Sequence, residues 1–397
     1  MFGGWVSLIP DTGRSMWLGY PQGMPRTPLP LDRFYSVIPA GGVGSRLWPL
    51  SRADAPKFLH DLTGSGQTLL KDTWDRLAPL SGEDHIMVVT GRAHRAAVEA
   101  QLPRLRDENT VLESEPRDST AAIGLAAAIL ERRTPGVIIG SFAADHVISG
   151  ASLFHDAVVA AVQAANVGYI ATIGITPTEP AVGFGYIECG DKLTIPGADH
   201  VSAVSSFVEK PDLATARRYL AGGRHLWNAG MFIASASTLL AEIGRTKPEL
   251  HAGLIELASQ WDDPATRGSA VDRIWPHLEK IAIDYSVAEP AAAAGRLAVV
   301  RGHFAWDDVG DFASLAKLNS HGQSGDLAIL GEGARVLSDS SSGIVVSRSK
   351  RVISLIGVQD IVVVDTPDAL LVTTSEHAQR VKVVVDALRL GGSSDVL

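Results

Sequence analysis

Beyond residue 33, short apolar runs alternate with amphipathic stretches, and this alternation limits the possible folds more than any other feature of the chain. Runs typical of buried β-strands occupy 35–38, 86–90, 110–113, 137–140 and 169–175. Helical patterns separate them, at 68–77, 94–102, 120–133 and 153–166. Strands alternating with helices at this spacing predict an α/β fold with a doubly wound, mixed but mainly parallel sheet, covered on both faces. Ligands bind such sheets at the carboxyl ends of the strands.

The rest of the chain is less regular. Strand patterns at 185–188, 201–209, 231–234 and 297–301 are interpreted as insertions that form one side of the ligand cleft. Near Gly322 the composition shifts towards Gly, Ser and Val, and short β runs follow at 343–347, 352–356 and 361–365, with a final helix at 377–388. We therefore expect a main domain over 34–321 and a small β-rich C-terminal domain over 322–397. Residues 1–33 have no periodicity and are interpreted as a disordered extension.

Composition excludes several classes of protein. The 397 residues, 46% of them hydrophobic, are enough for two domains with a substantial core. A net charge of −9 disfavours a general nucleic-acid or membrane surface, because those partners select a basic face. The single cysteine, Cys189, excludes an internal disulfide and favours a cytoplasmic location. No apolar run approaches the roughly 18 residues of a membrane span.

A glycine-rich loop follows the first predicted strand. Its backbone N–H groups can converge on one point and bind an anion, phosphate above all. A P-loop motif does not match here, and a dinucleotide-binding motif lacks its third glycine, because Leu47 stands in that place. Arg46 and Lys57 add two cations to the loop. The segment therefore favours a triphosphate as ligand; its residues are Ala40, Gly41, Gly42, Gly44, Ser45, Arg46 and Lys57.

Four further positions carry candidate chemistry, and each has a structural alternative. Asp145 ends a predicted strand, where a carboxylate suits Mg²⁺ but also suits a helix N-cap. Asp308 lies in the acidic run 307–311, which is also typical of a turn. Ser119 can cap the helix that begins near it. Pro211 favours an extended, polyproline-like conformation for Lys210.

Taken in order, these strings resemble the sugar-1-phosphate nucleotidylyltransferase family. The resemblance rests on the loop 41–57, Ala-Asp-His at 144–146, Gly-Phe-Gly-Tyr-Ile at 183–187, Val-Glu-Lys-Pro at 208–211, Asn-Ala-Gly at 228–230 and Trp-Asp-Asp-Val-Gly at 306–310. Trp48 with Ser51 and Arg52 is most similar to the branch of mannose-1-phosphate guanylyltransferases. The resemblance implies a Rossmann-like catalytic domain and a short β-helix-like C-terminal part that helps to form a homodimer. It also implies the conversion of GTP and α-D-mannose 1-phosphate into GDP-mannose and diphosphate.

The same resemblance assigns roles to individual residues. The implied catalytic residues are Arg46, Lys57, Asp145 and Lys210. Nucleotide binding is implied for Ala40, Gly41, Gly42, Gly44, Ser45, Arg46, Ser119 and Thr120. Sugar-phosphate binding is implied for Gly183, Tyr186, Glu209, Lys210 and Asn228. One Mg²⁺ ion is implied between Asp145 and Asp308, while Asp307 and Asp311 remain turn or capping residues.

Three departures from the family pattern keep alternatives open. Phe58 follows Lys57 where guanylyltransferases often carry Gln, Phe184 replaces a tyrosine, and Ser119 lies in a motif that is one residue shorter than usual. One alternative is a nucleotidylyltransferase for another pair of nucleotide and hexose 1-phosphate. A second is a homologue that binds a sugar nucleotide without turnover, which the intact set of charged residues disfavours.

Overall fold

A computed structural model of the chain describes residues 31, 33–198, 200–319 and 326–397. The extension expected over 1–33 therefore lies almost wholly outside the described residues. From residue 32 onward the chain forms one compact unit. None of the described helices is both long enough and apolar enough to cross a bilayer.

A nine-stranded mixed sheet, in the order β3-β2-β1-β4-β9-β6-β10-β8-β7, forms the centre of the main domain. Its strands are β1 (Phe34–Ala40), β2 (Ile86–Gly91), β3 (Thr110–Glu113), β4 (Ile138–Ser141), β6 (Ile170–Ile175), β7 (Tyr186–Lys192), β8 (Val201–Val208), β9 (His225–Ser235) and β10 (Leu297–Gly302). β8 and β9 pair antiparallel with their neighbours, and all other strands point the same way. The predicted mixed, mainly parallel sheet is confirmed.

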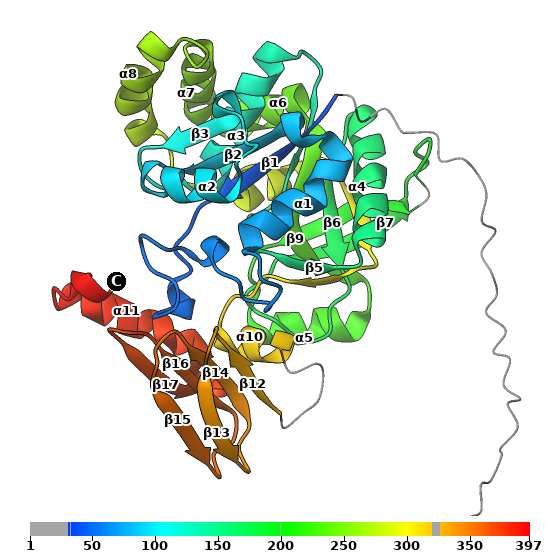
Figure 1. Cartoon of the computed structure of the whole chain (residues 1–397). Coiled ribbons are helices and arrows are strands. Elements are labelled where there is room, and N and C mark those ends of the chain that lie inside the picture. Colours follow the sequence, from blue (N-terminus) through cyan, green and yellow to red (C-terminus); the bar gives the residue numbers. More distant parts are fainter. Residues whose placement is uncertain (1–30, 32, 199, 320–325) are drawn as a thin grey trace, which may run out of the picture. The chain divides into compact units, whose positions relative to one another are not determined.

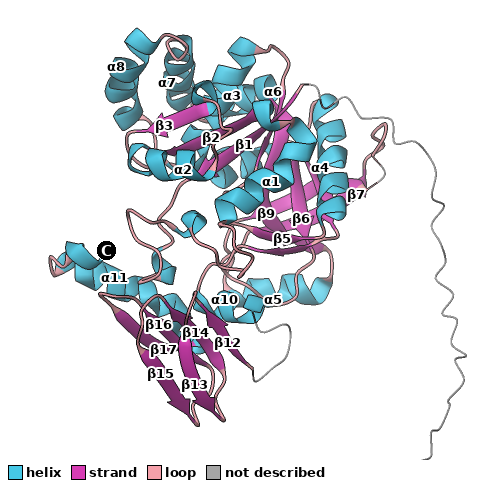
Figure 2. Ribbon diagram, viewed as in Figure 1, coloured by secondary structure: helices cyan, strands magenta, loops and turns pink. Residues whose placement is uncertain are grey.

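Helices cover both faces of this sheet, as Figure 2 shows. The helices of this part are α1 (Leu69–Ser81), α2 (Arg95–Gln101), α3 (Asp118–Arg133), α4 (Ala151–Asn166), α5 (Leu213–Gly222), α6 (Ala236–Thr246), α7 (Pro248–Ser259), α8 (Pro264–Ile274) and α9 (Glu289–Ala293). A further helix, α10 (Phe312–Asn319), packs on the C-terminal strands instead. Every residue of β6 is buried, which is why its sequence, Ile-Ala-Thr-Ile-Gly-Ile, shows no alternation of apolar and exposed polar residues. A large apolar cluster joins the sheet to α3, α6, α7 and α8.

The segment expected to be a set of insertions instead supplies four strands of the central sheet. β9 lies between β4 and β6, so it stands in the middle of the sheet and not at its border. The sequence predicted only its last residues, 231–234, because Asn228 and Gly230 interrupt the apolar pattern of this eleven-residue strand. A separate two-stranded sheet pairs β5 (Val147–Ser149) with β11 (Ala305–Asp307).

The C-terminal part is a short parallel β-helix followed by a helix (Figure 1). It contains β12 (Leu327–Leu330), β13 (Arg335–Asp339), β14 (Gly343–Ser347), β15 (Val352–Ile356), β16 (Ile361–Asp365), β17 (Leu370–Thr374) and α11 (Val381–Leu390). Residue 327 pairs with 343 and 343 with 361, while 335 pairs with 352, so successive turns take 16, 18 and 17 residues. The unequal turn lengths explain why no fixed repeat is visible in the sequence.

The loop between β1 and α1 packs directly on this C-terminal part. Leu47, Trp48 and Leu50 share one apolar cluster with strands β14 and β16 and with α11. The Trp48 indole N–H donates to the Val396 carbonyl at 2.6 Å. The Arg52 guanidinium donates to both carboxylate oxygens of Asp368, at 2.9 and 3.0 Å. The C-terminal part therefore supports the segment that follows the glycine-rich loop.

Candidate active site

The glycine-rich loop leaves β1 at its carboxyl end and forms an open cradle. Gly42 and Gly44 have φ values of 83° and 72°, which favour glycine. A Cβ on Gly44 would lie 2.7 Å from the Lys57 Cβ, so this position also needs glycine because of the close packing. Gly41, Gly42 and Arg46 are exposed, and the short helix η1 (Ser45–Leu47) presents the Arg46 side chain to solvent. The loop thus combines accessible backbone with a free-standing cation, the chemistry of a phosphate site.

Lys57 joins this loop to two acidic motifs. Its side chain is buried, 6% exposed, beneath Gly44. The ammonium lies 2.8 Å from a carboxylate oxygen of Asp145 and also donates to the Asp308 carbonyl. Lys57 and Asp308, 251 positions apart in the sequence, are therefore in direct contact. A buried ammonium needs such partners, because burial of an unpaired charge is very costly.

The two carboxylates respond differently to burial. Burial alone would raise the pKa of Asp145, but the Lys57 ammonium outweighs this effect and lowers the pKa. Burial raises the pKa of Asp308 to about 6, since attraction by Lys57 is opposed by Asp307 and Asp145. A further positive charge near Asp308 would favour its ionised form.

Pairing of β5 with β11 is what brings the two acidic motifs together. Asp307 pairs with Val147 and Trp306 with Ile148, so Asp308 follows one strand and Asp145 precedes the other. Across the same pair, the Trp306 indole N–H donates to His146 Nδ1 at 3.2 Å. Burial lowers the pKa of His146 to about 4, which leaves Nδ1 free to accept this bond at neutral pH.

The remaining aspartates of the second motif have structural roles. One Asp307 oxygen accepts the Val309 N–H at 2.7 Å and so closes a turn. Asp311 accepts the N–H groups of Ala313 and Ser314 at the start of α10. These two roles confirm the expectation of turn and capping residues. Asp145 lies in the turn between β4 and β5 and caps no helix, since α4 begins after Gly150.

A second polar cluster contains Glu209, Lys210 and Asn228, together with Asp284. The Lys210 ammonium lies 2.6 Å from Glu209 Oε1, while Glu209 Oε2 is buried without a hydrogen-bond partner among the described residues. The Asn228 amide donates to Asp284 Oδ1 at 2.8 Å, and its oxygen accepts from Thr172 and from the Gly230 N–H. A buried unpaired carboxylate oxygen beside an ordered amide is suited to hydroxyl donors from a ligand.

Lys210 does not have the expected extended conformation. Its φ is 50°, in the left-handed region that few side chains adopt. The Lys210 N–H donates to the Phe184 carbonyl at 3.2 Å, and the ammonium is held by Glu209. These two contacts outweigh the preference imposed by Pro211. They direct a cation towards the end of β8 at the cost of local backbone strain.

Asp284 was missed by the sequence analysis. It opens a single π-helical turn, η7 (Asp284–Ala288), of a kind that is frequent at functional sites. Burial and the nearby Glu209 carboxylate raise the pKa of Asp284 to about 6. No motif marks this residue, and only its position between apolar residues in 281–288 sets it apart.

Three predicted binding residues are buried and belong to the framework. Thr120 is fully buried and its hydroxyl bonds to that of Ser286 at 2.7 Å. Tyr186 is 1% exposed, with its hydroxyl donating to the Ala181 carbonyl. Ala40 is buried and its carbonyl accepts from Thr90. These contacts occupy the side-chain polar groups of Thr120 and Tyr186 and the Ala40 carbonyl, and the predicted binding roles of the three residues stay predictions.

Ser119 and Gly183 differ from those three. The Ser119 hydroxyl accepts the Ile283 N–H at 2.9 Å and so fixes the approach to η7, instead of capping α3. Gly183 is exposed, and a Cβ there would meet nothing within 4 Å. Next to it, the Phe184 ring lies 5.1 Å from both Trp227 and Trp306. This aromatic contact connects the second polar cluster to the acidic motifs.

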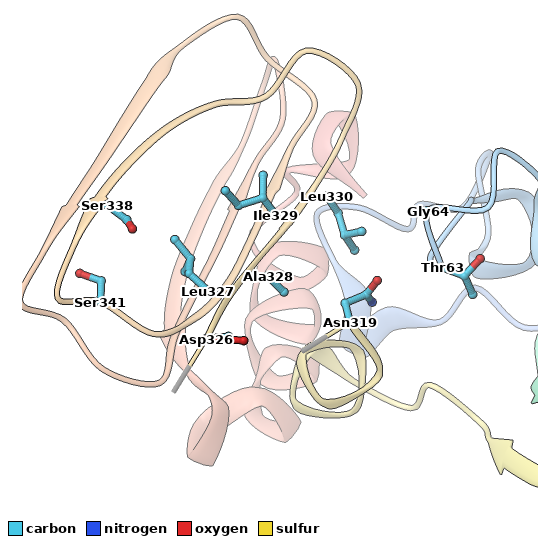
Figure 3. A pocket seen from close by; sticks show the side chains of 10 residues that line it. All are labelled: Thr63, Gly64, Asn319, Asp326, Leu327, Ala328, Ile329, Leu330, Ser338 and Ser341. Carbon is cyan, nitrogen blue, oxygen red and sulfur yellow. The ribbon is translucent and has the colours of Figure 1, made fainter. Parts of the chain in front are cut away.

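A separate cavity of about 630 Å³, shown in Figure 3, lies along β12 and the loop at Thr63 and Gly64. Its lining is made of hydroxyl, amide and aliphatic groups with one carboxylate, Asp326, and it contains no Lys or Arg. It shares no residue with either cluster. A phosphate ligand is therefore not expected there.

The arrangement is suited to two anions brought together. The glycine-rich loop with Arg46 and Lys57 can hold one, and Lys210 can hold the other. Asp145 and Asp308 can hold a hard cation between them, because Mg²⁺ takes one or two carboxylates and completes its shell with phosphate oxygens and water. No group of three or more His, Cys, Asp or Glu side chains among the described residues forms a self-sufficient metal site.

Comparison with known proteins gives the same picture. Residues 35–324 match the nucleotidyl transferase family, and 333–388 match the MannoseP isomerase/GMP-like beta-helix domain. The chain is 35% identical to mannose-1-phosphate guanylyltransferase of Klebsiella pneumoniae, over 90% of this chain and 74% of that protein. It is 36% identical to the enzyme of the same name from Salmonella typhimurium, over 91% of this chain and 74% of that protein.

A solved structure is similar over nearly the whole chain. It is described as mannose-1-phosphate geranyltransferase from Thermus thermophilus, with a TM-score of 0.79 and 31% identity, covering 90% of this chain and 99% of that one. A structure described as mannose-6-phosphate isomerase from Helicobacter pylori, 20% identical with a TM-score of 0.53, shares the fold. This chain is a nucleotidyltransferase enzyme and belongs to the family of the mannose-1-phosphate guanylyltransferases.

Proposed function

We propose that this enzyme converts GTP and α-D-mannose 1-phosphate into GDP-mannose and diphosphate. The observation that carries the proposal is the meeting of Lys57, Asp145 and Asp308 directly beneath the glycine-rich loop. A triphosphate held by that loop would have a cation and two carboxylates at its side. The substrates in this proposal are inferred from the names of the relatives, and they are a hypothesis about this chain.

Mg²⁺ is the metal that this site would take, held by Asp145 and Asp308. The residues fit, because two carboxylates converge there and burial raises the pKa of Asp308 in a way that an added cation would relieve. When bound, the ion would neutralise charge on the reacting phosphates. Relatives of this kind typically use a divalent metal ion.

The side chains of the protein would position two anions against their mutual repulsion. Arg46, Lys57 and the loop amides would hold the triphosphate, and Lys210 would hold the phosphate of the sugar. An oxygen of the sugar phosphate would then attack the α-phosphorus in line, and diphosphate would leave. No covalent enzyme intermediate is needed, because the attacking oxygen is already anionic; catalysis is positioning and charge stabilisation.

The second polar cluster is suited to the hexose. Glu209 Oε2 is buried without a partner and would accept a sugar hydroxyl. Asn228 is fixed by Thr172, Gly230 and Asp284, so it would present an ordered amide to another hydroxyl. Fixed polar groups of this kind give specificity, because a sugar without the matching hydroxyl leaves them unpaired.

A different nucleotide is the second candidate. Trp48 and Arg52, which suggested a guanylyltransferase, contact the C-terminal part through Val396 and Asp368. They therefore provide no contact that selects the base. Release of diphosphate should be measured with each of the four NTPs against mannose 1-phosphate and glucose 1-phosphate. Turnover with GTP and mannose 1-phosphate supports the first proposal, whereas a strong signal only with another pair supports the second.

Two substitutions test the mechanism in the same assay. We expect Arg46→Ala and Asp145→Ala to fold and to lose about 100-fold or more in turnover, as when a preorganised charge-stabilising group is removed. Circular dichroism checks the fold of each variant. Near-normal rates in both variants would refute the proposed roles of these residues.

We also propose that the enzyme works in the cytoplasm as a homodimer that associates through the β-helix. Support for the dimer comes from apolar side chains on its strands that stay in solvent, since Leu337 is 65% exposed and Ile356 76%. Analytical ultracentrifugation of Ile356→Lys against the native chain tests this. A dimer of unchanged strength in the variant would argue against this interface.

A further inference from the structure

A second cluster of basic side chains lies around β7, β8 and β10, at the end of the strand order that is farthest from β3. It lines a cavity of about 260 Å³ that contains none of the proposed substrate-binding residues. The lining residues are Cys189, Lys192, His200, Ser202, Leu226, Val299, Arg301 and His303. Lys192 and Arg301 supply an ammonium and a guanidinium group, and the two histidines add polar ring nitrogens. Among the described residues, which leave out residue 199, no carboxylate lines the cavity.

Strand register brings these side chains together. Ser202 of β8 pairs with Lys192 of β7 on one side and with Val299 of β10 on the other. Partners across strands present their side chains on the same face. Arg301 lies two residues beyond Val299 on β10 and therefore also faces this side. The cavity thus has a buried apolar floor, at Val299 and Leu226, with Ser202 and the two cations above it.

An irregularity in β7 adds Cys189 to the same cavity. Cys189 and Lys192 are three residues apart, so regular pleating would put them on opposite faces. The pairing of β7 with β8 shifts register between these two residues, and both side chains then line the one cavity. Bulges of this type often redirect a side chain near functional sites.

None of the ion pairs within the part of the chain that the structure describes involves the two cations of this cavity. Within the described residues, neither Lys192 nor Arg301 has an ion-pair partner, and Arg301 donates only to the Thr176 hydroxyl at 3.2 Å. The nearby Glu188 is already paired with Arg224 at 2.6 Å. In a chain of net charge −9, two cations and two histidines around one hollow are an unusual local concentration.

We propose that this cavity is a second anion-binding site, which takes a small phosphorylated compound through Lys192, Arg301 and the two histidines. The guanidinium fork of Arg301 suits two phosphate oxygens, and Lys192 supplies a mobile charge beside it. The Ser202 hydroxyl would donate a further bond. Leu226 lies two residues before Asn228 on β9, so one strand connects the floor of this cavity to the proposed sugar site.

Cys189 is the only cysteine of the chain, and it offers a local probe of occupancy. We expect inorganic pyrophosphate to slow the reaction of Cys189 with a neutral maleimide about tenfold at saturation, because the bound anion would cover the thiol and oppose its ionisation. Sodium chloride at equal ionic strength should slow it far less. Equal slowing by chloride would refute the proposal.

Substitutions identify the groups that hold the anion. Arg301→Gln and Lys192→Gln should each raise the half-saturating pyrophosphate concentration about tenfold, the size expected for one charged hydrogen bond. Arg132→Gln, an exposed arginine on α3, is the matched control and should leave it unchanged. The ratio of rates with and without anion is compared within each variant, since burial raises the pKa of the Cys189 thiol and Arg301 opposes that rise.

Calorimetric titration with pyrophosphate separates this site from the active site. Arg46→Ala should retain one binding event, and Arg301→Gln should weaken that event about tenfold while it keeps turnover. An unchanged titration in Arg301→Gln would overturn the proposal. So would protection of Cys189 at an unchanged pyrophosphate concentration in both Arg301→Gln and Lys192→Gln. Neither outcome depends on which sugar nucleotide the enzyme makes.

Discussion

Asp284 is a residue whose charged form the fold disfavours. Its pKa is raised to about 6, from a usual value near 4, by burial and by the Glu209 carboxylate. A carboxyl group whose pKa is raised by folding destabilises the folded state when it is ionised. The loss of stability develops between about pH 4 and pH 6 and reaches its full size above about pH 6. We expect Asp284→Asn to raise the melting temperature at pH 8, with a difference that shrinks to nothing near pH 4.

Thermal unfolding followed by circular dichroism at several pH values measures this effect. Asp156→Asn is the control, because Asp156 is an exposed carboxylate on α4 and should give no pH-dependent difference. A constant difference between Asp284→Asn and the native chain at all pH values would show that the ionisation of Asp284 is not responsible.

At the scale of single residues, the sequence predicts which charged groups meet at the site better than it predicts the contacts of other residues in the same motifs. Lys57, Asp145 and Asp308 were predicted from motifs, and the structure brings them together at one point. Thr120 and Arg52 belong to strings of the same kind, yet one is buried against Ser286 and the other binds Asp368. A motif fixes which residue types occur, whereas the tertiary contacts decide whether a side chain faces the ligand or the framework.

At the scale of elements, η7 is held against α3 by two buried hydroxyl groups. Thr120 and Ser286 are both fully buried and bond to one another at 2.7 Å. We expect Thr120→Val to cost about 1–3 kcal/mol of unfolding free energy, because it leaves the Ser286 hydroxyl buried without its partner. Ser286→Ala should cost a similar amount.

The double variant is the decisive measurement. When both hydroxyls are absent no polar group is left unpaired, so Thr120→Val with Ser286→Ala should cost clearly less than the sum of the single variants. Urea denaturation of the four proteins gives the coupling. Strict additivity would mean that this bond does not hold η7 in place.

Strands whose sequences show a regular apolar pattern were predicted, and strands without such a pattern were not. β1, β2, β3 and β4 appear in the sequence as buried runs, because they are covered on both faces. β9 was only partly predicted, since Asn228 and Gly230 interrupt it. The three-residue strands β5 and β11 carry no pattern, and only their pairing shows why the two acidic motifs meet.

At the scale of the whole molecule, one apolar cluster joins the catalytic part to the C-terminal part. It contains Leu47, Trp48 and Phe312 on one side and Ile344, Val364 and Val385 on the other. Such a shared core should make the two parts unfold together. Val385 of α11 is 4% exposed, while Val383 on the same helix is 63% exposed, so these two valines form a matched pair.

Val385→Ala should destabilise the protein by about 1–3 kcal/mol through the lost packing, and Val383→Ala by less than about 0.5 kcal/mol. All eight tryptophans lie at or before residue 306, and of the described ones only Trp48 packs against the C-terminal part, so their fluorescence reports mainly on the catalytic part. If the cluster couples the two parts, Val385→Ala will lower the tryptophan-detected melting temperature as much as the one detected by circular dichroism. A tryptophan transition that stays at the native temperature would instead mean that the β-helix unfolds independently and that the loop after Gly44 keeps its structure without it.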